Sequence, residues 1–531
     1  MLGGELSFHF LNVMLMTAIV APLVLWRYRR AVLAGMRARA GAVLPLAPPR
    51  GAPPRPAQAP TSSVDVKLAW ERRVRRRVFA AVVGALFVPA LLLGAHDVSL
   101  NALPMTPVNV LLIASVATLM AVPMFGMLAA LPFWRTVALG VATLCAFAAL
   151  LVTVSMLQRA LAGKAPSIDQ LMNFVVFVEY AGFTLWLPLA LAALLGARRV
   201  RGVAPFVFAG LLVFAFAPLL GVRMTQALAG MRWSSGLALQ GGVHVGALVL
   251  ALPVGLLAWW RLKALARAYD AKRFSDAQLL AHSWWLMFVA VHAVEQVSVH
   301  PGTTALLRIA AVHAAAYLLF PWLLARALAW AARVEPRPPR RMLLVLRVFG
   351  DAGRTAALFD RIASRWQRFG PVTTIASPDA AAATVDPGDL LRFASGRIGT
   401  GFVQSGQDLA QRLAAIDLEP DRDGRFRISE FCCADDTWQA TVVALIARTD
   451  AVVMDLRGFT LQRHGCAFEL EQLAARVDPE RVVLVVDAST DRALLTRSLP
   501  PGAGAMRTAE VRRGHSRQAD QAFAALLAAA A

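Results

Sequence analysis

The sequence predicts a polytopic α-helical membrane domain of about nine spans, followed by a cytosolic α/β domain with a parallel sheet. Hydrophobic residues make up 58% of the 531 residues, charged residues only 16%, and the mean hydropathy is +0.57. The formal net charge of +21 arises in residues 1–340, which hold 31 basic and 10 acidic residues, whereas residues 341–531 hold 23 of each. This composition excludes an ordinary soluble enzyme and a disordered chain.

The membrane domain, residues 1–334, is predicted from apolar runs of about 18–25 residues, the length that crosses a hydrocarbon core. The eighth run is the weakest, because it contains His282, His292 and Glu295, and a re-entrant segment is the alternative there. The nine runs cover about residues 8–26, 78–95, 108–131, 137–157, 171–195, 203–222, 237–259, 281–299 and 305–325.

The loops between these runs predict the topology. The loop at 27–77 carries 13 basic residues and a Pro-rich stretch that is typical of disorder, whereas the loop at 96–107 has no Lys or Arg. Counted over all loops, 26 basic residues fall on one side and 5 on the other, and the basic side is cytoplasmic. We therefore expect a bacterial inner-membrane protein with its N-terminus outside, which contacts the lipid bilayer and no nucleic acid.

Polar residues inside the predicted spans are candidates for function, because they are costly to bury in lipid. Glu179 lies within the fifth run, and His292 and Glu295 share one helical face close to His313 in the next run. This histidine-rich face is compatible with a metal site or a proton relay. The alternative is that these groups satisfy one another across packed helices.

A short Pro-rich linker at 335–341 leads into the second domain, residues 342–531. There, short apolar runs alternate with amphipathic ones, a pattern that favours a parallel sheet covered by helices on both faces. The balanced charge of this segment predicts that it folds by itself. The predicted strands are 343–348, 372–376, 426–431, 451–456 and 482–486, and the predicted helices are 354–369, 404–416, 437–449, 463–477, 490–498 and 515–529.

Residues 341–531 contain no Lys, which excludes a P-loop, a protein kinase site and a Schiff-base enzyme. We expect no metal in this domain, because its cysteines and histidines lack the spacing of zinc ligands. The cytosolic location predicts that Cys432, Cys433 and Cys466 are free thiols.

The carboxyl ends of the predicted strands meet at one edge of the sheet, where ligands of such folds bind. The segment at 451–473 runs from a strand, through a loop with Asp455 and Arg457, into a helix with His464 and Glu469. The cation and the helix start are suited to a phosphate group. We expect a nucleotide, NAD or another, to contact a cleft formed by these four residues. Arg347 and Asp379 are expected as neighbours of that cleft.

The same segment resembles the TIR superfamily and the related nucleoside deoxyribosyltransferase-like proteins through Cys466, Glu469 and Leu470, which match a Cys-x-x-Glu-Leu motif at a helix start. The resemblance implies a flavodoxin-like sheet and possible self-association through this domain. It also implies a catalytic role for Glu469, since the matching Glu is catalytic in the NAD-cleaving members. Without that role, Glu469 is a first-turn carboxylate favoured by the helix dipole.

Three functions follow as expectations. The first is a membrane-anchored signalling or defence protein whose TIR-like domain binds a nucleotide or a protein partner. The second is a hydrolase that cleaves the N-glycosidic bond of NAD or a nucleoside with Glu469. The third is a transporter with a cytosolic regulatory domain.

The topology is testable with reporter fusions after Ala531. Because the loop charges place this end in the cytoplasm, a fluorescent reporter that folds only in the cytoplasm is expected to be active there. Periplasmic phosphatase activity at the same fusion point would contradict the predicted topology.

Overall fold

The computed structural model describes residues 22–36, 63–102, 105–119, 133–161, 163, 260, 263–300, 302–335, 337–347, 352–376, 387–433, 436–499, 506–512 and 516–530. The chain divides into two compact units. We call residues 1–25, 79–328 and 385–395 the helical unit, and residues 26–78, 329–384 and 396–531 the sheet unit. The predicted spans at 171–195, 203–222 and 237–259, the Pro-rich stretch, Glu179 and Asp379 lie outside the described residues.

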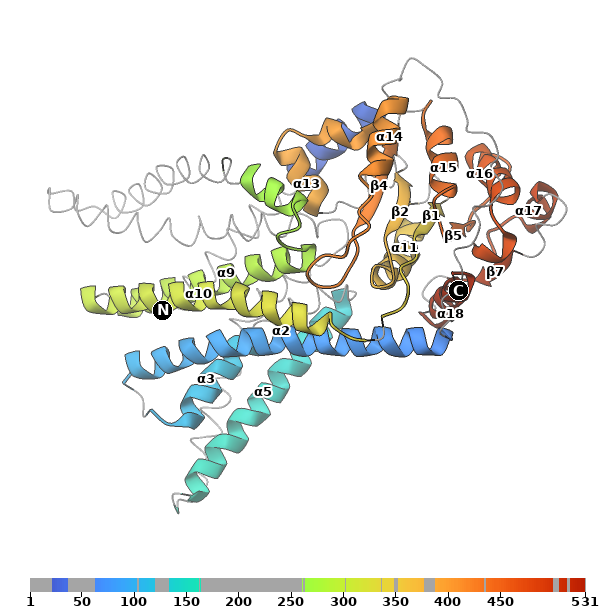
Figure 1. Cartoon of the computed structure of the whole chain (residues 1–531). Coiled ribbons are helices and arrows are strands. Elements are labelled where there is room, and N and C mark those ends of the chain that lie inside the picture. Colours follow the sequence, from blue (N-terminus) through green and yellow to red (C-terminus); the bar gives the residue numbers. More distant parts are fainter. Residues whose placement is uncertain are drawn as a thin grey trace. The chain divides into compact units, whose positions relative to one another are not determined.

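Three helices are long and apolar enough to cross a membrane, in the part of the chain that the structure describes. They are α2 (Val64–Leu100), α9 (Asp276–Val299) and α10 (Thr303–Ala331), and they coincide with the second, eighth and ninth predicted spans (Figure 1). The eighth run is a continuous helix of 24 residues, which begins with a capping box formed by Ser275 and Gln278. Helices α3 (Pro107–Leu119) and α5 (Phe133–Leu161) coincide with the start of the third predicted span and with the fourth.

Helix α2 begins well before the apolar run that predicts it. Its residues 64–78 lie in the predicted basic loop and belong to the sheet unit, whereas residues 79–100 belong to the helical unit. The first part forms a helix because Lys67, Trp70, Glu71 and Val74, at helical spacing, make one buried face, while the arginines between them are exposed.

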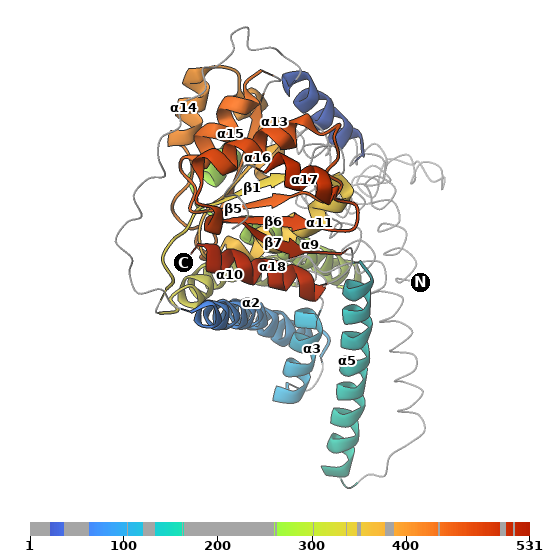
Figure 2. The ribbon, with the colours of Figure 1, turned by 90° about the vertical axis from the view of Figure 1, so that its right-hand side faces the viewer.

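The sheet unit contains seven parallel strands in the order β3-β4-β2-β1-β5-β6-β7, which confirms the predicted parallel sheet (Figure 2). Buried apolar runs form its central strands, as the sequence predicts. The strands are β1 (Leu343–Arg347), β2 (Val372–Ala376), β3 (Phe402–Val403), β4 (Ile428–Cys433), β5 (Ala451–Asp455), β6 (Val482–Val486) and β7 (Arg507–Glu510).

Helices cover both faces of the sheet, because alternate strand residues point to opposite sides. Leu343 and Val345 of β1 pack with α11 (Ala352–Trp366) and α18 (Ser516–Ala529), in a core that also contains Trp70 and Val74 of α2. Leu344 and Leu346 pack on the other face. Its helices are α14 (Gly406–Ala414), α15 (Trp438–Ile446), α16 (His464–Arg476) and α17 (Arg492–Ser498).

The sequence analysis did not predict the strands β3 and β7 or the helix α13. β3 has only two residues, and β7 reads Arg-Thr-Ala-Glu, so neither shows the apolar run that signals a buried strand. Helix α13 (Pro387–Ala394) belongs to the helical unit, where its Leu391 packs with Ala266, Tyr269 and Leu279.

A substitution of Trp366 tests the described packing of the sheet unit. Its side chain has an exposed fraction of 0%, and its indole N–H donates to the Arg341 carbonyl at 3.0 Å. We expect Trp366→Ala to lower the free energy of unfolding of the sheet unit by about 3–5 kcal/mol, because the substitution leaves a large cavity. Hydrogen exchange of the β1 and β5 amides in the full-length chain measures this loss. Leu461→Ala is the control, since Leu461 is 71% exposed; an equal effect of the two substitutions would contradict the described core.

Candidate functional site at the carboxyl edge of the sheet

The strand order of the sheet reverses between β1 and β5. β2 lies on one side of β1, and β5, β6 and β7 follow on the other. In open parallel sheets, ligands bind beyond the carboxyl ends of the strands at such a reversal. The register of the two strands pairs Arg347 with Asp455, the last residue of each. Two of the predicted site residues therefore lie side by side at this position.

Arg347 is buried and lies on the sheet face covered by α11. Its guanidinium is 4.5 Å from the centre of the Phe359 ring, and its Nη2 is 3.6 Å from Oε1 of Glu430 on β4. The positive charge of Arg347 is thus balanced by a carboxylate from two strands away. Sequence reasoning did not select Glu430, although a carboxylate inside a predicted strand was the available signal.

Asp455 and Arg457 form a buried ion pair. Arg457 donates from Nε to Oδ1 at 2.8 Å and from Nη2 to Oδ2 at 2.7 Å, and its backbone N–H also donates to Oδ1 at 3.2 Å. Gly458 follows with φ of +80°, a conformation that suits glycine, and turns the chain toward α16. The sequence predicts that Arg457 contacts a phosphate group. In the structure its planar fork holds the carboxylate that ends β5, which orders the loop before α16.

Glu469 lies on α16 and has an exposed fraction of only 1%. The buried residues of α16 are Cys466, Glu469, Leu470 and Leu473, so the buried face of this helix includes the carboxyl group. Burial raises the pKa of Glu469 from 4.5 to about 8. Among the described residues, its Oε2 has no hydrogen-bond partner. At neutral pH this side chain therefore favours its protonated, uncharged form.

Two predicted site residues remain, His464 and Asp379. His464 is the first residue of α16, and its side chain is exposed, whereas Asp379 lies outside the described residues. Across the described ranges, no group of three His, Cys, Asp or Glu residues is arranged to hold a metal ion. Among the described residues, Cys432, Cys433 and Cys466 form no disulfide.

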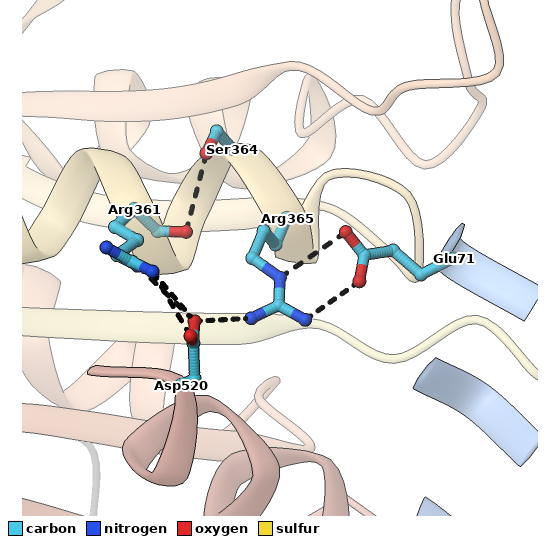
Figure 3. Close-up of polar contacts among 5 residues, drawn as sticks. All are labelled: Glu71, Arg361, Ser364, Arg365 and Asp520. Atoms are coloured by element: carbon cyan, nitrogen blue, oxygen red, sulfur yellow. Dashed lines mark hydrogen bonds and ion pairs between the residues drawn. The ribbon is translucent and has the colours of Figure 1, made fainter. Parts of the chain in front are cut away.

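A second polar cluster joins α2 to the sheet unit (Figure 3). Glu71 accepts two hydrogen bonds from Arg365 of α11, from Nε at 3.3 Å and from Nη2 at 2.8 Å. Arg365 also donates from Nη1 to Asp520 of α18 at 3.1 Å, and Asp520 in turn accepts from Arg361. We call Glu71, Arg361, Arg365 and Asp520 the docking network. It links three helices through charges of alternating sign.

Two further contacts complete the attachment of α2. Lys67 Nζ donates to the carbonyl of Leu527 at 3.1 Å, near the last turn of α18, where a cation is favourable. Burial lowers the pKa of Lys67, and the charge of Arg341 lowers it further. The indole of Trp70 donates to the Val334 carbonyl at 2.9 Å. Sequence reasoning missed these residues because Glu71 and Arg365 are 294 positions apart. The available signal was the carboxylate of Glu71 directly before the arginines at 72, 73, 75, 76 and 77.

No family model matches the chain, and no curated protein or solved structure matches it. The likeness to the TIR superfamily is therefore carried by Cys466, Glu469 and Leu470 alone. The ligands that this edge of the sheet can bind depend on its charged and buried groups. They comprise the buried Asp455–Arg457 ion pair, the partly exposed Arg347–Glu430 ion pair and one buried carboxyl group on α16.

The pKa of Glu469 gives a pH-dependent prediction. Between about pH 4.5 and pH 8 the folded chain keeps the proton that the unfolded chain releases, so stability falls as pH rises through this window. Glu469→Gln removes this dependence. We expect the variant to equal the wild type near pH 4.5 and to exceed it at pH 7 by about 1–3 kcal/mol.

The measurement is the urea-unfolding midpoint of the sheet unit across that pH range. Glu471→Gln is the matched control, because Glu471 lies on the same helix with its side chain exposed. If wild type and Glu469→Gln give parallel curves, Glu469 is ionised in the folded chain and the burial described here is wrong.

Proposed function

We propose that the chain is a membrane-anchored signalling protein, in which the sheet unit binds a ligand and helix α2 carries the bound state to the membrane spans. The observation that carries this proposal is the continuity of α2. Its 37 residues form one helix, whose first part buries Lys67, Trp70 and Glu71 in the sheet unit and whose second part is apolar enough to cross a membrane. A rigid helix shared in this way transmits small shifts at its docked end.

The proposed ligand is a nucleotide at the carboxyl edge between β1 and β5. Support comes from five of the seven strands, whose order β2-β1-β5-β6-β7 resembles the order 2-1-3-4-5 of flavodoxin-like sheets, which bind ligands at this reversal. The strands β4 and β3 extend this sheet beyond β2. The likeness of the α16 segment to TIR domains points to the same ligand class. We place this domain in the bacterial cytoplasm, as the loop charges predict.

A nucleotide- or NAD-cleaving activity is less well supported by the geometry. An oxocarbenium-like transition state needs an ionised carboxylate that reaches the sugar. Glu469 is buried, and its raised pKa of about 8 favours the neutral acid at pH 7. The proposed role of Glu469 is therefore structural, and the proposed action of the domain is binding without turnover.

The test uses the full-length chain in lipid nanodiscs, with NAD and ATP as separate probes and hydrogen exchange as the readout. We expect one nucleotide to slow exchange at the ends of β1 and β5 and to change exchange in residues 64–78. Glu71→Gln is expected to speed exchange in residues 64–78 about tenfold or more, because it breaks one side of a buried ion pair. Asp65→Asn is the matched control, since Asp65 lies exposed on the same helix.

Three results would contradict parts of this proposal. Release of nicotinamide from NAD would establish the hydrolase instead. If neither NAD nor ATP changes hydrogen exchange, the proposal that the ligand is a nucleotide is wrong. If a nucleotide binds but hydrogen exchange in residues 64–78 stays unchanged, α2 anchors the sheet unit and does not transmit the bound state.

A further inference from the structure

Three helices of the helical unit contribute to a chain of hydrogen-bonded ionisable side chains. His313 of α10 and His292 of α9 face each other, with Nε2 of His313 2.8 Å from Nδ1 of His292. The other nitrogen of His292, Nε2, is 3.1 Å from Oδ2 of Asp97 on α2. At the opposite end, Nδ1 of His313 is 2.7 Å from the carbonyl oxygen of Ile309. The sequence predicts Asp97 in a loop, whereas the structure places it in the last turns of α2.

The carbonyl oxygen of Ile309, at one end of this series of side chains, fixes the direction of the hydrogen bonds. A carbonyl oxygen only accepts, so Nδ1 of His313 carries a hydrogen. If His313 is neutral, its Nε2 is then an acceptor, and Nδ1 of His292 must donate to it. The remaining nitrogen of a neutral His292, Nε2, carries a lone pair that faces Asp97. That contact is satisfied only when a proton lies between them, on the carboxyl group or on the imidazole.

The other arrangement of hydrogens leads to the same count. If His292 donates from Nε2 to the Asp97 carboxylate and stays neutral, its Nδ1 becomes the acceptor. His313 must then donate from both nitrogens, and it carries the additional proton as an imidazolium. Every arrangement that satisfies all three contacts therefore contains one proton more than two neutral histidines and a carboxylate. Such an arrangement has no net charge, which suits a buried position.

We propose that Asp97, His292 and His313 form a proton-binding site, which holds one proton that moves along the three side chains. In its forward step, the Asp97 carboxyl proton passes to Nε2 of His292, the Nδ1 proton of His292 passes to Nε2 of His313, and the charge ends as Asp97 carboxylate and His313 imidazolium. The burial of Asp97 supports the site, since its Oδ1 has no partner among the described residues. Loss of the proton would bring a lone pair against a carboxylate and weaken the contact between α2 and α9.

Other ionisable groups surround the site on the same helices. His96 of α2 lies edge-on to His313, with ring centres 5.8 Å apart, and its Nε2 is buried without a partner in the described part of the chain. Arg308 of α10 donates to Ser99 at 2.9 Å, and His300 lies 3.3 Å from Asn101. The His96 and Arg308 side chains adjust the field at the site, but neither is bonded into the chain of three.

The test is nitrogen-15 NMR of the full-length chain in lipid bilayers, with labelled histidine and a pH titration. We expect a coupling across the hydrogen bond between His292 and His313, and histidine signals that report one shared proton. Asp97→Asn should abolish the titration of that proton, because its amide N–H donates to Nε2 of His292 without any proton to lose. Asp97→Glu should retain the titration, and His300→Gln is the matched control that should leave it unchanged.

Two results would overturn the proposal. One is that folded Asp97→Asn titrates as the wild type does, or that the folded wild type shows no coupling between His292 and His313. The other is that added Zn²⁺ binds stoichiometrically to the wild type and removes the coupling at neutral pH, which would make these residues metal ligands. If Asp97→Asn does not fold, His292→Gln gives the same comparison, because it also removes the shared proton.

Discussion

The paired hydrogen bonds between Glu71 and Arg365 hold α2 in one register on the sheet unit. A carboxylate with 2% exposure is costly unless it is paired, and removal of one partner of such a pair typically costs about 3–5 kcal/mol. A shift of α2 by one residue would move Glu71 away from Arg365. The same shift would take Lys67 from the end of α18 and Trp70 from the Val334 carbonyl. One charge pair thus selects the alignment, and the apolar contacts of Trp70 and Val74 stabilise it.

Local patterns predict the central sheet, because each buried strand is encoded by its own run of apolar residues. The strands β2 and β6 begin and end where the sequence predicts, and β1 and β5 differ by one residue. The position of Arg347 beside Asp455 also follows from strand order, since parallel strands end at one edge. The partners of these side chains do not follow, because Glu430 and Glu71 are brought to their arginines only by the tertiary fold.

Buried charge explains why the predicted pocket residues take different positions in the structure. Arg457 and Asp455 are two residues apart in the sequence and pair with each other at the turn, which removes the solvent-facing cation that the sequence predicts. Glu469 has no cation bonded to it among the described contacts, and it is kept in the core by protonation instead. A helical wheel gives the direction of a side chain from its own helix. It contains no information about the neighbouring helix α15, whose Trp438 packs against Phe468 of α16.

The two outer strands of the sheet limit how neighbouring copies of the chain can associate. β3 offers only two residues for pairing, and β7 exposes Arg507 and Glu510 at its ends. Short and charged edges resist the addition of a strand from a neighbouring molecule. For a chain anchored in a bilayer, as proposed above, copies reach high local concentrations, so protection against edge-to-edge aggregation matters. Any specific association between copies must then use helical surfaces, which can separate again without unravelling the sheet.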